Sequence, residues 1–541
     1  MSTPTPADRA LTAEVATRRT FAIISHPDAG KTTLTEKFLL YAGAVHEAGA
    51  VKSRKVARST TSDWMKLEQE RGISISSTVL HFAYRDWRFN LLDTPGHADF
   101  SEDTYRTLWA ADAAVMVVDM AKGLEPQTLK LFKVCRDRGI PIVTFVNKCD
   151  RPGLAPLAIL DEISAEIGLE PVPMVWPIAD GPEFGGVVDR QAGEFVAFGR
   201  SAHGTKQAEE TRVPLAEANR AALAPQTTQL RWDTAFEELE LLDAEDHVLD
   251  RDAFLAGKQT PVFFGSALAN FGVRQLLEGF AALAPSPGPQ PVIEPERSPA
   301  RDVTAPFSAL VFKIQANMDP RHRDRVAFLR VQSGRFARGM TATHARTGRP
   351  FALKYAHQLF AQDRETVEEA VAGDIVGVVN ATDLLVGDTL YAEDRVVFPP
   401  IPTFAPERFV AARNRDTSRY KQFRRGLAQL DEEGVVHVLR RPEYGDQEPL
   451  LAGVGQLQFE VAEHRMREEF GAEMALSPAP WQLARLVVEG DVALLRGQRG
   501  TMVVEDSKGR TLALFNSEHA LTWASQDHPQ VRFAELGMTR S

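Results

Sequence analysis

The N-terminal part of the chain has a predicted strand, a glycine-containing loop and a predicted helix in immediate succession. The apolar run Phe21–Ser25 predicts a buried strand, and Thr32–Tyr41 has the spacing of an amphipathic helix. The residues from the loop into the helix are His26, Pro27, Asp28, Ala29, Gly30, Lys31, Thr32 and Thr33. Ser25 stands where the pattern G-x-x-x-x-G-K-[ST] begins with Gly, and it is small enough for a tight turn.

A strand, loop and helix in this succession can form a polyphosphate site, because the backbone N–H groups of the loop and the positive end of the helix point at the same place. We expect Lys31 to neutralise the β- and γ-phosphates of a nucleotide, and the Thr32 hydroxyl to bind Mg²⁺. The alternative is an ordinary strand–turn–helix in which the letters GKT occur by chance. The rest of the sequence separates the two interpretations.

Short apolar runs alternate with amphipathic stretches through the first half of the chain. The predicted strands are Phe21–Ser25, Phe89–Asp93, Ala113–Asp119, Pro141–Asn147, Pro173–Ile178 and Val262–Gly265, and Ser101–Ala111 is a further predicted helix. Buried strands that alternate with helices predict an α/β fold with a doubly wound, mostly parallel sheet. Residues 180–250 are more polar and acidic, so we expect an insertion on that sheet.

A second motif follows the strand Phe89–Asp93, and it consists of Asp93, Thr94, Pro95, Gly96 and His97. The carboxyl ends of parallel strands meet at one edge of a sheet, so Asp93 is expected beside the phosphate loop. There it would hold Mg²⁺ through a water molecule, while the Gly96 N–H faces the γ-phosphate.

Two further motifs point to guanine as the base. Asn147, Lys148, Cys149 and Asp150 follow one strand, and Ser266, Ala267 and Leu268 follow another. The Asp150 carboxylate can accept hydrogen bonds from guanine N1–H and the 2-amino group, which adenine does not offer. The motif of Ser266, Ala267 and Leu268 resembles the loop whose backbone N–H contacts guanine O6. Four motifs in this order predict a site for GTP and GDP.

A polar segment from Asp63 to Ile75 lies between the first two motifs. In nucleotide switches the segment at this position becomes ordered when a γ-phosphate and Mg²⁺ are bound. Ser74 is the candidate second hydroxyl ligand for Mg²⁺. Taken alone, the segment would be interpreted as a polar loop that leads into a strand.

Proline clusters divide the remainder of the chain. We expect a nucleotide-binding domain over 1–284, a proline-rich linker over 285–306, a β-barrel domain over 307–397 and an α+β domain over 398–541. The composition agrees with several soluble domains, because 541 residues with a net charge of −11 and two cysteines do not fit a small disulfide-stapled module.

No apolar run approaches the roughly 20 residues needed to span a bilayer. The stretch Thr17–Phe21 has the twin arginines of an export signal, but only Ala22, Ile23 and Ile24 follow before polar residues. We therefore expect a cytoplasmic protein without a membrane partner.

Together, the letters RGI[ST]I and DTPGH resemble the translational GTPase family, in which His97 matches the catalytic histidine. More narrowly, the chain resembles the branch of that family that acts in translation termination. The matching stretches are Arg19–Thr33, Ser62–Ile75, Asn90–Thr107, Pro261–Val273, Val311–Leu329, Gly426–Gly434 and Gly453–Glu460. Ser25 in place of Gly and Ser74 in place of Thr are typical of this branch.

This resemblance implies a P-loop GTPase domain followed by a β-barrel and an α+β domain. It also implies ribosome-dependent hydrolysis of GTP, and a function in which the protein stimulates and recycles the codon-reading peptide chain release factors. The expected partners are therefore the ribosome, with its rRNA and proteins, and those factors. Alternatives left open are a GTPase like elongation factor G, a ribosomal-protection GTPase, and a nucleotide-gated scaffold on the ribosome.

A ribosomal partner requires positive charge somewhere on an acidic chain. Residues 301–430 hold 20 Lys and Arg against 14 Asp and Glu, a net of +6, so the rest of the chain carries −17. The densest clusters are Arg321, Arg323 and Arg325, and then Arg413, Arg415, Arg419, Lys421, Arg424 and Arg425. Few aromatic residues lie among them, so contact with RNA phosphates is expected and base stacking is not.

Overall fold

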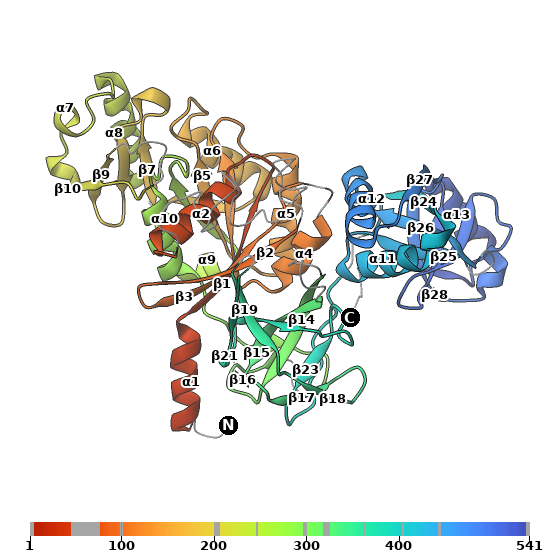
Figure 1. Cartoon of the computed structure of the whole chain (residues 1–541). Coiled ribbons are helices and arrows are strands. Elements are labelled where there is room, and N and C mark those ends of the chain that lie inside the picture. The colour runs from red at the N-terminus through yellow and green to blue at the C-terminus, as the bar shows by residue number, and fades with distance from the viewer. Residues whose placement is uncertain are drawn as a thin grey trace.

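The computed structural model describes residues 5–44, 76–97, 99, 101–199, 206–244, 247–295, 300–316, 325–360, 363–402, 405–441 and 445–536. An N-terminal α/β domain, a β-barrel and a C-terminal α+β domain follow one another along the chain, as Figure 1 shows. Within these described ranges, no helix is both long enough and apolar enough to cross a membrane.

A seven-stranded sheet forms the centre of the N-terminal domain. Its strands, in spatial order, are β2 (Thr78–Tyr84), β3 (Trp87–Asp93), β1 (Arg18–Ser25), β4 (Ala113–Asp119), β5 (Ile142–Asn147), β11 (Gln259–Phe264) and β6 (Glu170–Pro173). Only the β2–β3 pair is antiparallel. Every residue of β1, β4, β5 and β11 is buried, which explains their continuous apolar runs. The predicted doubly wound sheet is confirmed.

Helices connect these strands. They are α2 (Lys31–Tyr41), α4 (Ser101–Trp109), α5 (Pro126–Asp137), α6 (Pro156–Glu162), α9 (Arg251–Leu255) and α10 (Val273–Leu283). The helices predicted from Thr32 and from Ser101 therefore exist, with ends that differ by one or two residues.

The single strand expected over Pro173–Ile178 is wrong. β6 ends at Pro173, and Val175 starts a new strand, β7 (Val175–Ile178), which belongs to a separate antiparallel sheet. The residue between them, Met174, donates its N–H to Val262 and accepts from Arg190, so the chain passes from one sheet to the other there. The apolar run is continuous because both strands are buried.

The separate sheet has the strand order β10 (Glu210–Pro214), β9 (Glu194–Phe198), β8 (Gly186–Asp189) and β7. The helices α7 (Arg220–Leu223) and α8 (Gln229–Ala244) follow it in the chain and lie with it at the upper left of Figure 1. Trp232 of α8 packs edge-on against Phe195 of β9, which attaches the helix to this sheet.

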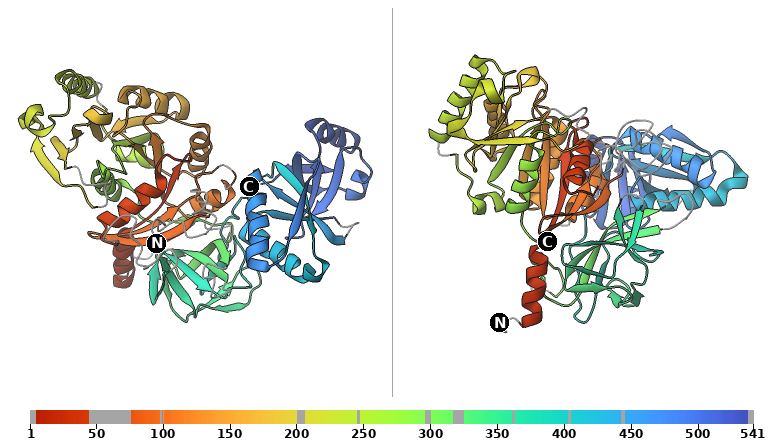
Figure 2. Two further views of the ribbon diagram at one scale, coloured as in Figure 1. Left: turned by 45° about the horizontal axis from the view of Figure 1, so that its top comes forward. Right: turned by 60° about the vertical axis from the view of Figure 1, so that its left-hand side comes forward.

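The β-barrel has an eight-stranded sheet and a two-stranded one. The larger sheet has the order β18 (Pro350–Ala352), β17 (Thr341–His344), β23 (Thr389–Tyr391), β14 (Ser308–Ala316), β15 (Arg325–Ser333), β22 (Ile375–Val379), β19 (Ala356–Phe360) and β20 (Asp363–Thr366), and β16 (Arg335–Ala337) pairs with β21 (Glu369–Val371). The N-terminal helix α1 (Pro6–Ala16) extends from β1 beside the barrel, as both views in Figure 2 show, and buries Val15 against Val303 and Val371.

The described residues of the proline-rich stretch, 285–295 and 300–306, are more ordered than an extended linker. Two short strands within it, β12 (Gln290–Pro291) and β13 (Ala300–Arg301), pair with each other, and Val303 is buried.

The C-terminal domain is built on a second eight-stranded sheet. Its order is β27 (Met474–Pro478), β24 (Arg408–Asn414), β26 (Gly445–Gly453), β25 (His437–Arg441), β29 (Thr501–Glu505), β30 (Thr511–Phe515), β28 (Leu483–Glu489) and β31 (Arg532–Glu535). Two of its helices are α11 (Tyr420–Glu433) and α12 (Gln456–Phe470). Strands β28–β31 and helix α13 (Glu518–Asp527) have no counterpart in the sequence analysis.

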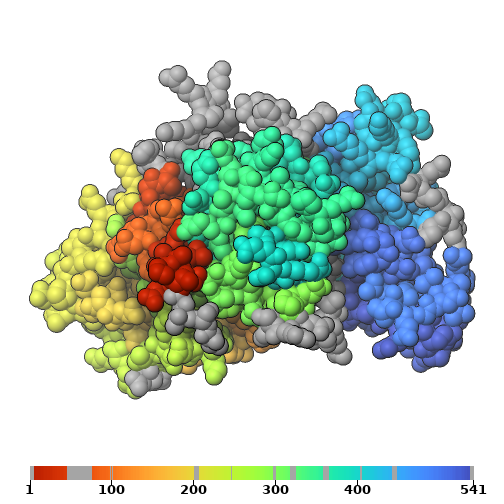
Figure 3. All heavy atoms as spheres, turned by 90° about the horizontal axis from the view of Figure 1, so that it is seen from below, coloured from red at the N-terminus to blue at the C-terminus, as the bar shows by residue number. Residues whose placement is uncertain are grey.

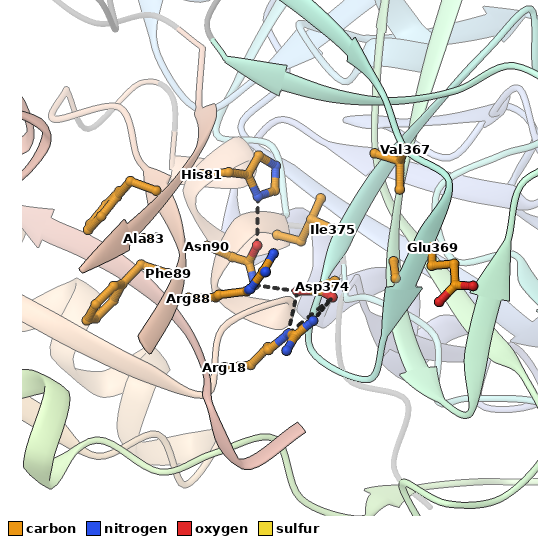
Figure 4. A pocket seen from close by; sticks show the side chains of 12 residues that line it. Arg18, His81, Ala83, Arg88, Phe89, Asn90, Val367, Glu369, Asp374 and Ile375 are labelled. Atoms are coloured by element: carbon orange, nitrogen blue, oxygen red, sulfur yellow. Dashed lines mark hydrogen bonds and ion pairs between the residues drawn. The ribbon is translucent and has the colours of Figure 1, made fainter. Parts of the chain in front are cut away.

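The barrel is joined to the starting ends of β1 and β3. Arg18 forms an ion pair with Asp374 at 3.3 Å, and Thr20 donates its hydroxyl hydrogen to the Gly373 carbonyl at 2.7 Å. Asn90 also donates to that carbonyl, at 3.2 Å, and its side-chain oxygen lies 2.7 Å from His81 Nδ1. Figure 4 shows Arg18, Asp374, Asn90 and His81 around a pocket of about 200 Å³. The pocket lies at the opposite end of the strands from the phosphate loop.

A buried arginine makes a second joint between the barrel and the N-terminal domain. Arg330 of β15 is 1% exposed, and it donates to Asp112 at 2.5 Å and to the Ala110 carbonyl at 2.9 Å. Seen from below in Figure 3, the barrel lies between the N-terminal domain and the C-terminal domain. The outer two domains also contact each other directly, because Arg106 donates to the Glu433 carbonyl.

Arg330→Ala should lower the free energy of unfolding by about 3–5 kcal/mol, because it leaves the Asp112 carboxylate buried without its cation. The measurement is denaturant unfolding followed by intrinsic fluorescence. The matched control is Arg338→Ala, since Arg338 pairs with Glu368 on the exposed surface of the same barrel. That change should stay within about 0.5 kcal/mol. Equal effects of the two substitutions would contradict the claim that Arg330 stabilises the contact between the barrel and the N-terminal domain.

Candidate nucleotide-binding site

Five parallel strands place their last residues along one edge of the central sheet. Ser25 ends β1, Asp93 ends β3, Asp119 ends β4, Asn147 ends β5 and Phe264 ends β11. All four motifs singled out from the sequence follow one of these strand ends. The structure therefore brings the predicted loops together, and it adds the strand end at Asp119, which the sequence analysis did not use.

The phosphate loop passes close to the loop after β5. Gly30 caps α2 in a left-handed conformation with φ 98°, and a Cβ there would overlap the amide of Asn147. The Asn147 amide nitrogen donates to the Ala29 carbonyl at 2.7 Å. The left-handed conformation and the close approach of the Asn147 amide both require glycine at position 30. Asp28 is also left-handed, with φ 66°.

Lys31 connects the phosphate loop with the loop after β3. Its side chain is 6% exposed, and Nζ lies 2.9 Å from Asp93 Oδ1 and also donates to the Thr94 carbonyl. The Thr94 hydroxyl in turn donates to the Ile23 carbonyl at 2.6 Å. This ammonium is thus held among oxygen acceptors at the start of α2.

Thr32, Thr33 and Gly96 are further predicted residues of these two loops. Thr32 and Thr33 are the second and third residues of α2 and are half-buried. Gly96, which follows Pro95, lies against Pro27, because a Cβ added to it would be 3.5 Å from the Pro27 Cα. The two loops are therefore in van der Waals reach of one another.

The loops after β5 and β11 are joined by hydrogen bonds. The Asn147 carbonyl Oδ1 accepts the Ala267 N–H at 2.8 Å, and the Cys149 N–H donates to Gly265 at 3.0 Å. Burial raises the pKa of the Cys149 thiol, so this side chain is a neutral core residue. Ser266 is fully buried, whereas Leu268 is 51% exposed. Asp150 follows in the same loop and is half-buried.

Lys148 bridges the phosphate loop and β4. Its Nζ donates to the Asp28 carbonyl at 2.6 Å and to Asp119 Oδ2 at 2.7 Å. Burial by itself would raise the pKa of Asp119, but the hydrogen bond from Lys148 lowers it, so the carboxylate stays charged.

His26 holds the phosphate loop against the start of α5. The ring is 2% exposed and its Nε2 lies 2.5 Å from Glu125 Oε2. Burial lowers the pKa of His26 below its ordinary value, despite the nearby Glu125 carboxylate. His26 could be assigned to the loop from the sequence, but Glu125 could not, because no local pattern identifies it.

His97 follows Gly96 and is 38% exposed. Its Nδ1 accepts the Asp99 N–H at 3.2 Å and lies 3.5 Å from Asp99 Oδ1. Asp99 is a second residue that the sequence analysis missed. Ser74, the expected further ligand of Mg²⁺, lies outside the described residues.

Helix α4 lies between the barrel and the C-terminal domain. On the barrel side, Lys313 of β14 donates to Asp103 at 3.2 Å and to the Ser77 carbonyl at 2.5 Å. On the other side, Glu102 Oε2 lies 2.7 Å from His437 Nε2, and Arg106 donates to the Glu433 carbonyl at 3.2 Å. The helix that follows the DTPGH loop thus contacts both other domains.

Three family models match consecutive parts of the chain. The elongation factor Tu GTP binding domain matches residues 16–286, elongation factor G domain 2 matches 306–393, and the C-terminal domain of class II release factor RF3 matches 398–525. A curated peptide chain release factor 3 from Cyanothece sp. is 49% identical over 97% of this chain and 96% of its own length. The chain belongs to the peptide chain release factor 3 family.

Other members of the release factor 3 family agree over the same span. The relative from Trichormus variabilis is 50% identical over 96% of this chain and 95% of its own length, and the one from Gloeobacter violaceus is 49% identical over 99% of both. A solved structure of a Thermus thermophilus protein superposes with a TM-score of 0.68 at 26% identity, over 92% of this chain and 72% of that chain. Family membership makes this chain a translational GTPase that binds guanine nucleotides.

The contact between Glu102 and His437 should make the position of the C-terminal domain depend on pH. Burial by itself lowers the pKa of His437, but the Glu102 carboxylate outweighs it, with help from Asp431, and raises the pKa above 6.5 although Arg106 opposes this. Burial by itself raises the pKa of Glu102, and Arg106 and His437 lower it to about 2. Docking should therefore be strongest below pH 6.5 and weaken as pH rises through the raised pKa of His437.

Energy transfer between dyes on α8 and α13 measures this effect, recorded from about pH 5.5 to about pH 8.5. The variant His437→Gln keeps a hydrogen-bond donor without a titrating charge, so its signal should stay flat over that range. If it changes with pH as the unsubstituted protein does, another group is responsible.

Proposed function

We propose that this chain hydrolyses GTP on the ribosome during translation termination, and that it thereby stimulates and recycles the codon-reading peptide chain release factors. The observation that carries the proposal is the meeting of the four loops. Lys31 contacts Asp93, and Asn147 joins Ala29 to Ala267. The match of residues 398–525 to the release factor C-terminal domain supports termination as the setting. Work on ribosomes also implies a cytoplasmic location.

In this proposal the phosphate loop from Ser25 to Thr33 receives the polyphosphate. Backbone N–H groups and the positive end of α2 attract the phosphates, and Lys31 neutralises their charge. The hydroxyl of Thr32 and the carboxylate of Asp93 are the hard oxygen donors that Mg²⁺ prefers. They would hold the ion, Asp93 through a water molecule, with Ser74 as a further ligand. The ion would offset the charge that develops between the β- and γ-phosphates.

The loops after β5 and β11 receive the guanine. Asp150 accepts from guanine N1–H and the 2-amino group, while the backbone of Ser266, Ala267 and Leu268 faces O6. The 51% exposure of Leu268 is consistent with a side chain at the rim of a base pocket. A base with a different edge would leave Asp150 without its donors, which costs about 1.5–3 kcal/mol for a charged acceptor.

His97 orients the attacking water once the ribosome has positioned the ring. The segment from Thr94 to His97 lies directly after Asp93, so a γ-phosphate that binds Gly96 also moves the histidine. We further propose that the domains 1–284, 307–397 and 398–541, joined by 285–306, change their relative positions after hydrolysis. Helix α4 would transmit that change, since it contacts the other two domains.

A GTPase like elongation factor G is the first alternative, and a scaffold that binds nucleotide without needing turnover is the second. The first is disfavoured because the C-terminal residues match the release factor model and the curated relatives are of nearly the same length. The second is disfavoured because Lys31, Asp93 and His97 are all present, and phosphoryl transfer needs a cation, a Mg²⁺-holding carboxylate and a residue that orients water.

His97→Ala should leave GTP binding unchanged and lower ribosome-stimulated hydrolysis by about 10²–10⁴-fold, the usual contribution of a group that assists proton transfer. The measurements are nucleotide affinity by fluorescence and single-turnover hydrolysis with saturating ribosomes. Asp150→Ala serves as the matched variant, because it removes a contact to the guanine base and should weaken the affinity for GTP. A His97 variant that loses affinity to the same degree as Asp150→Ala would make His97 structural.

The basic residues of the C-terminal domain supply a candidate contact for ribosomal phosphates. Arg415, Arg419 and Lys421 are exposed at the start of α11 and just before it. Arg325, from the other predicted cluster, instead donates to two carbonyls of the barrel and is 14% exposed. Arg321 and Arg323 lie outside the described residues. We therefore confine the proposed contact to the cluster at α11.

Replacing Arg415, Arg419 and Lys421 together by alanine should weaken ribosome binding and flatten its dependence on salt, because up to three phosphate contacts are lost. Co-sedimentation at several salt concentrations measures both. The control removes the same charge from α5 by replacing Lys130, Lys133 and Arg136, which are also exposed. Equal losses in the two triple variants would indicate a general charge effect and remove the proposed contact.

A further inference from the structure

One residue of the DTPGH loop reaches the C-terminal domain. Asp99 Oδ2 accepts the Leu457 N–H at 2.7 Å, and Leu457 is the second residue of α12. The residue that caps this helix is Gly455, which has no side chain to supply an acceptor. A Cβ on Gly455 would overlap the Asp99 carboxylate, so the glycine leaves room for it. Asp99 therefore caps α12 from another domain.

Such a contact is energetically favourable for two reasons. A carboxylate satisfies a backbone N–H that has no partner within the helix, and it meets the positive end of the helix dipole. Gly455 has an extended backbone, with φ −140°, so any residue could adopt this conformation and the need for glycine is steric. The closeness of Asp99 supplies that steric reason.

The same residue also holds the predicted catalytic histidine. The backbone N–H of Asp99 donates to His97 Nδ1 at 3.2 Å, while its carboxylate is bound by α12. In this arrangement 38% of the His97 side chain faces solvent, whereas Lys31, at the phosphate end of the loop, is 6% exposed. The His97 ring is therefore held by Asp99, and the C-terminal domain holds Asp99 in place through α12.

Two further contacts make the C-terminal domain and this segment move together. His437 pairs with Glu102, and the Glu433 carbonyl accepts from Arg106. A C-terminal domain that leaves α4 must therefore also leave Asp99. The position of α12 and the freedom of His97 are linked through one residue, Asp99, whose carboxylate binds α12 and whose backbone N–H binds His97.

We propose that Asp99 is a positioning residue for His97, and that α12, when docked on Asp99, restrains the histidine and keeps hydrolysis slow away from the ribosome. Withdrawal of α12 frees Asp99 and with it the ring. This inference rests on the proposed role of His97 in orienting water.

Gly455→Ala tests the restraint in the purified full-length chain without ribosomes. The added methyl group displaces Asp99, so kcat for GTP hydrolysis should rise about five-fold, the factor that corresponds to a typical helix-capping contact, with KM unchanged. Gly288→Ala is the control, because a Cβ at Gly288 meets no atom within 4 Å. An unchanged or lowered kcat in Gly455→Ala would overturn the proposal.

Two more variants separate positioning from a general loss of structure. Asp99→Ala removes the same contact from the other side, so it should raise kcat to the same extent, and combining it with Gly455→Ala should add nothing. In the His97→Ala background the rise should disappear. A rise that persists without His97 would mean that the contact restrains something other than the histidine.

Hydrogen exchange at the Leu457 amide shows whether the capping contact itself exists. Exchange should be slow in the unsubstituted chain and faster in Asp99→Ala. This readout and the ribosome-free assay do not depend on termination. If His97→Ala retains ribosome-stimulated hydrolysis, the proposed catalytic role of His97 fails. If Asp99→Ala speeds exchange at Leu457 but does not raise kcat, the proposed restraint of His97 fails and the proposed function stands.

Discussion

The segment from Asp93 to Arg106 is the part of the molecule on which the other contacts depend. Its first residue pairs with Lys31 of the phosphate loop, and its helix is held by Lys313 of the barrel and by His437 of the C-terminal domain. All three domains therefore meet on one short stretch of chain. A change at the phosphate end of this stretch acts on both other domains without a long path through the core.

The contacts around this segment are mostly ionic and partly buried. Such pairs contribute little net stability compared with apolar packing, but removing one partner leaves a costly buried charge. They therefore favour one relative position of the domains over others that would leave a charge unpaired. If the domains were in apolar contact alone, they could slide over one another. A conformational switch driven by a bound phosphate group requires two distinct relative positions of the domains.

The nucleotide loops could be predicted from the sequence because the rule behind them is local. A buried run gives a parallel strand, and parallel strands place the residues that follow them at a common edge, as Asp93 and Asn147 show. Glu125 and Asp99 could not be predicted in this way. Their partners, His26 and Leu457, lie far from them in the sequence or in another domain, and no periodicity records such a pair.

Errors in the predicted fold have similar causes. The run Pro173–Ile178 is apolar throughout because two different sheets bury its two halves, so burial alone did not reveal the break at Met174. Strand β28 is half-buried along most of its length, and its sequence shows neither a continuous apolar run nor a clear alternation. The basic cluster with Arg325 was interpreted as a surface, yet that guanidinium serves the barrel's own carbonyls.

The central claim is that nucleotide at the strand ends controls the departure of a codon-reading release factor from the ribosome. The most direct measurement follows a labelled release factor on stalled termination complexes after addition of this chain with GTP, with GDP or with a non-hydrolysable analogue. We predict that departure depends on which nucleotide is present and that repeated turnover requires GTP hydrolysis. Departure at the same rate with every nucleotide, or none with any, would contradict the account.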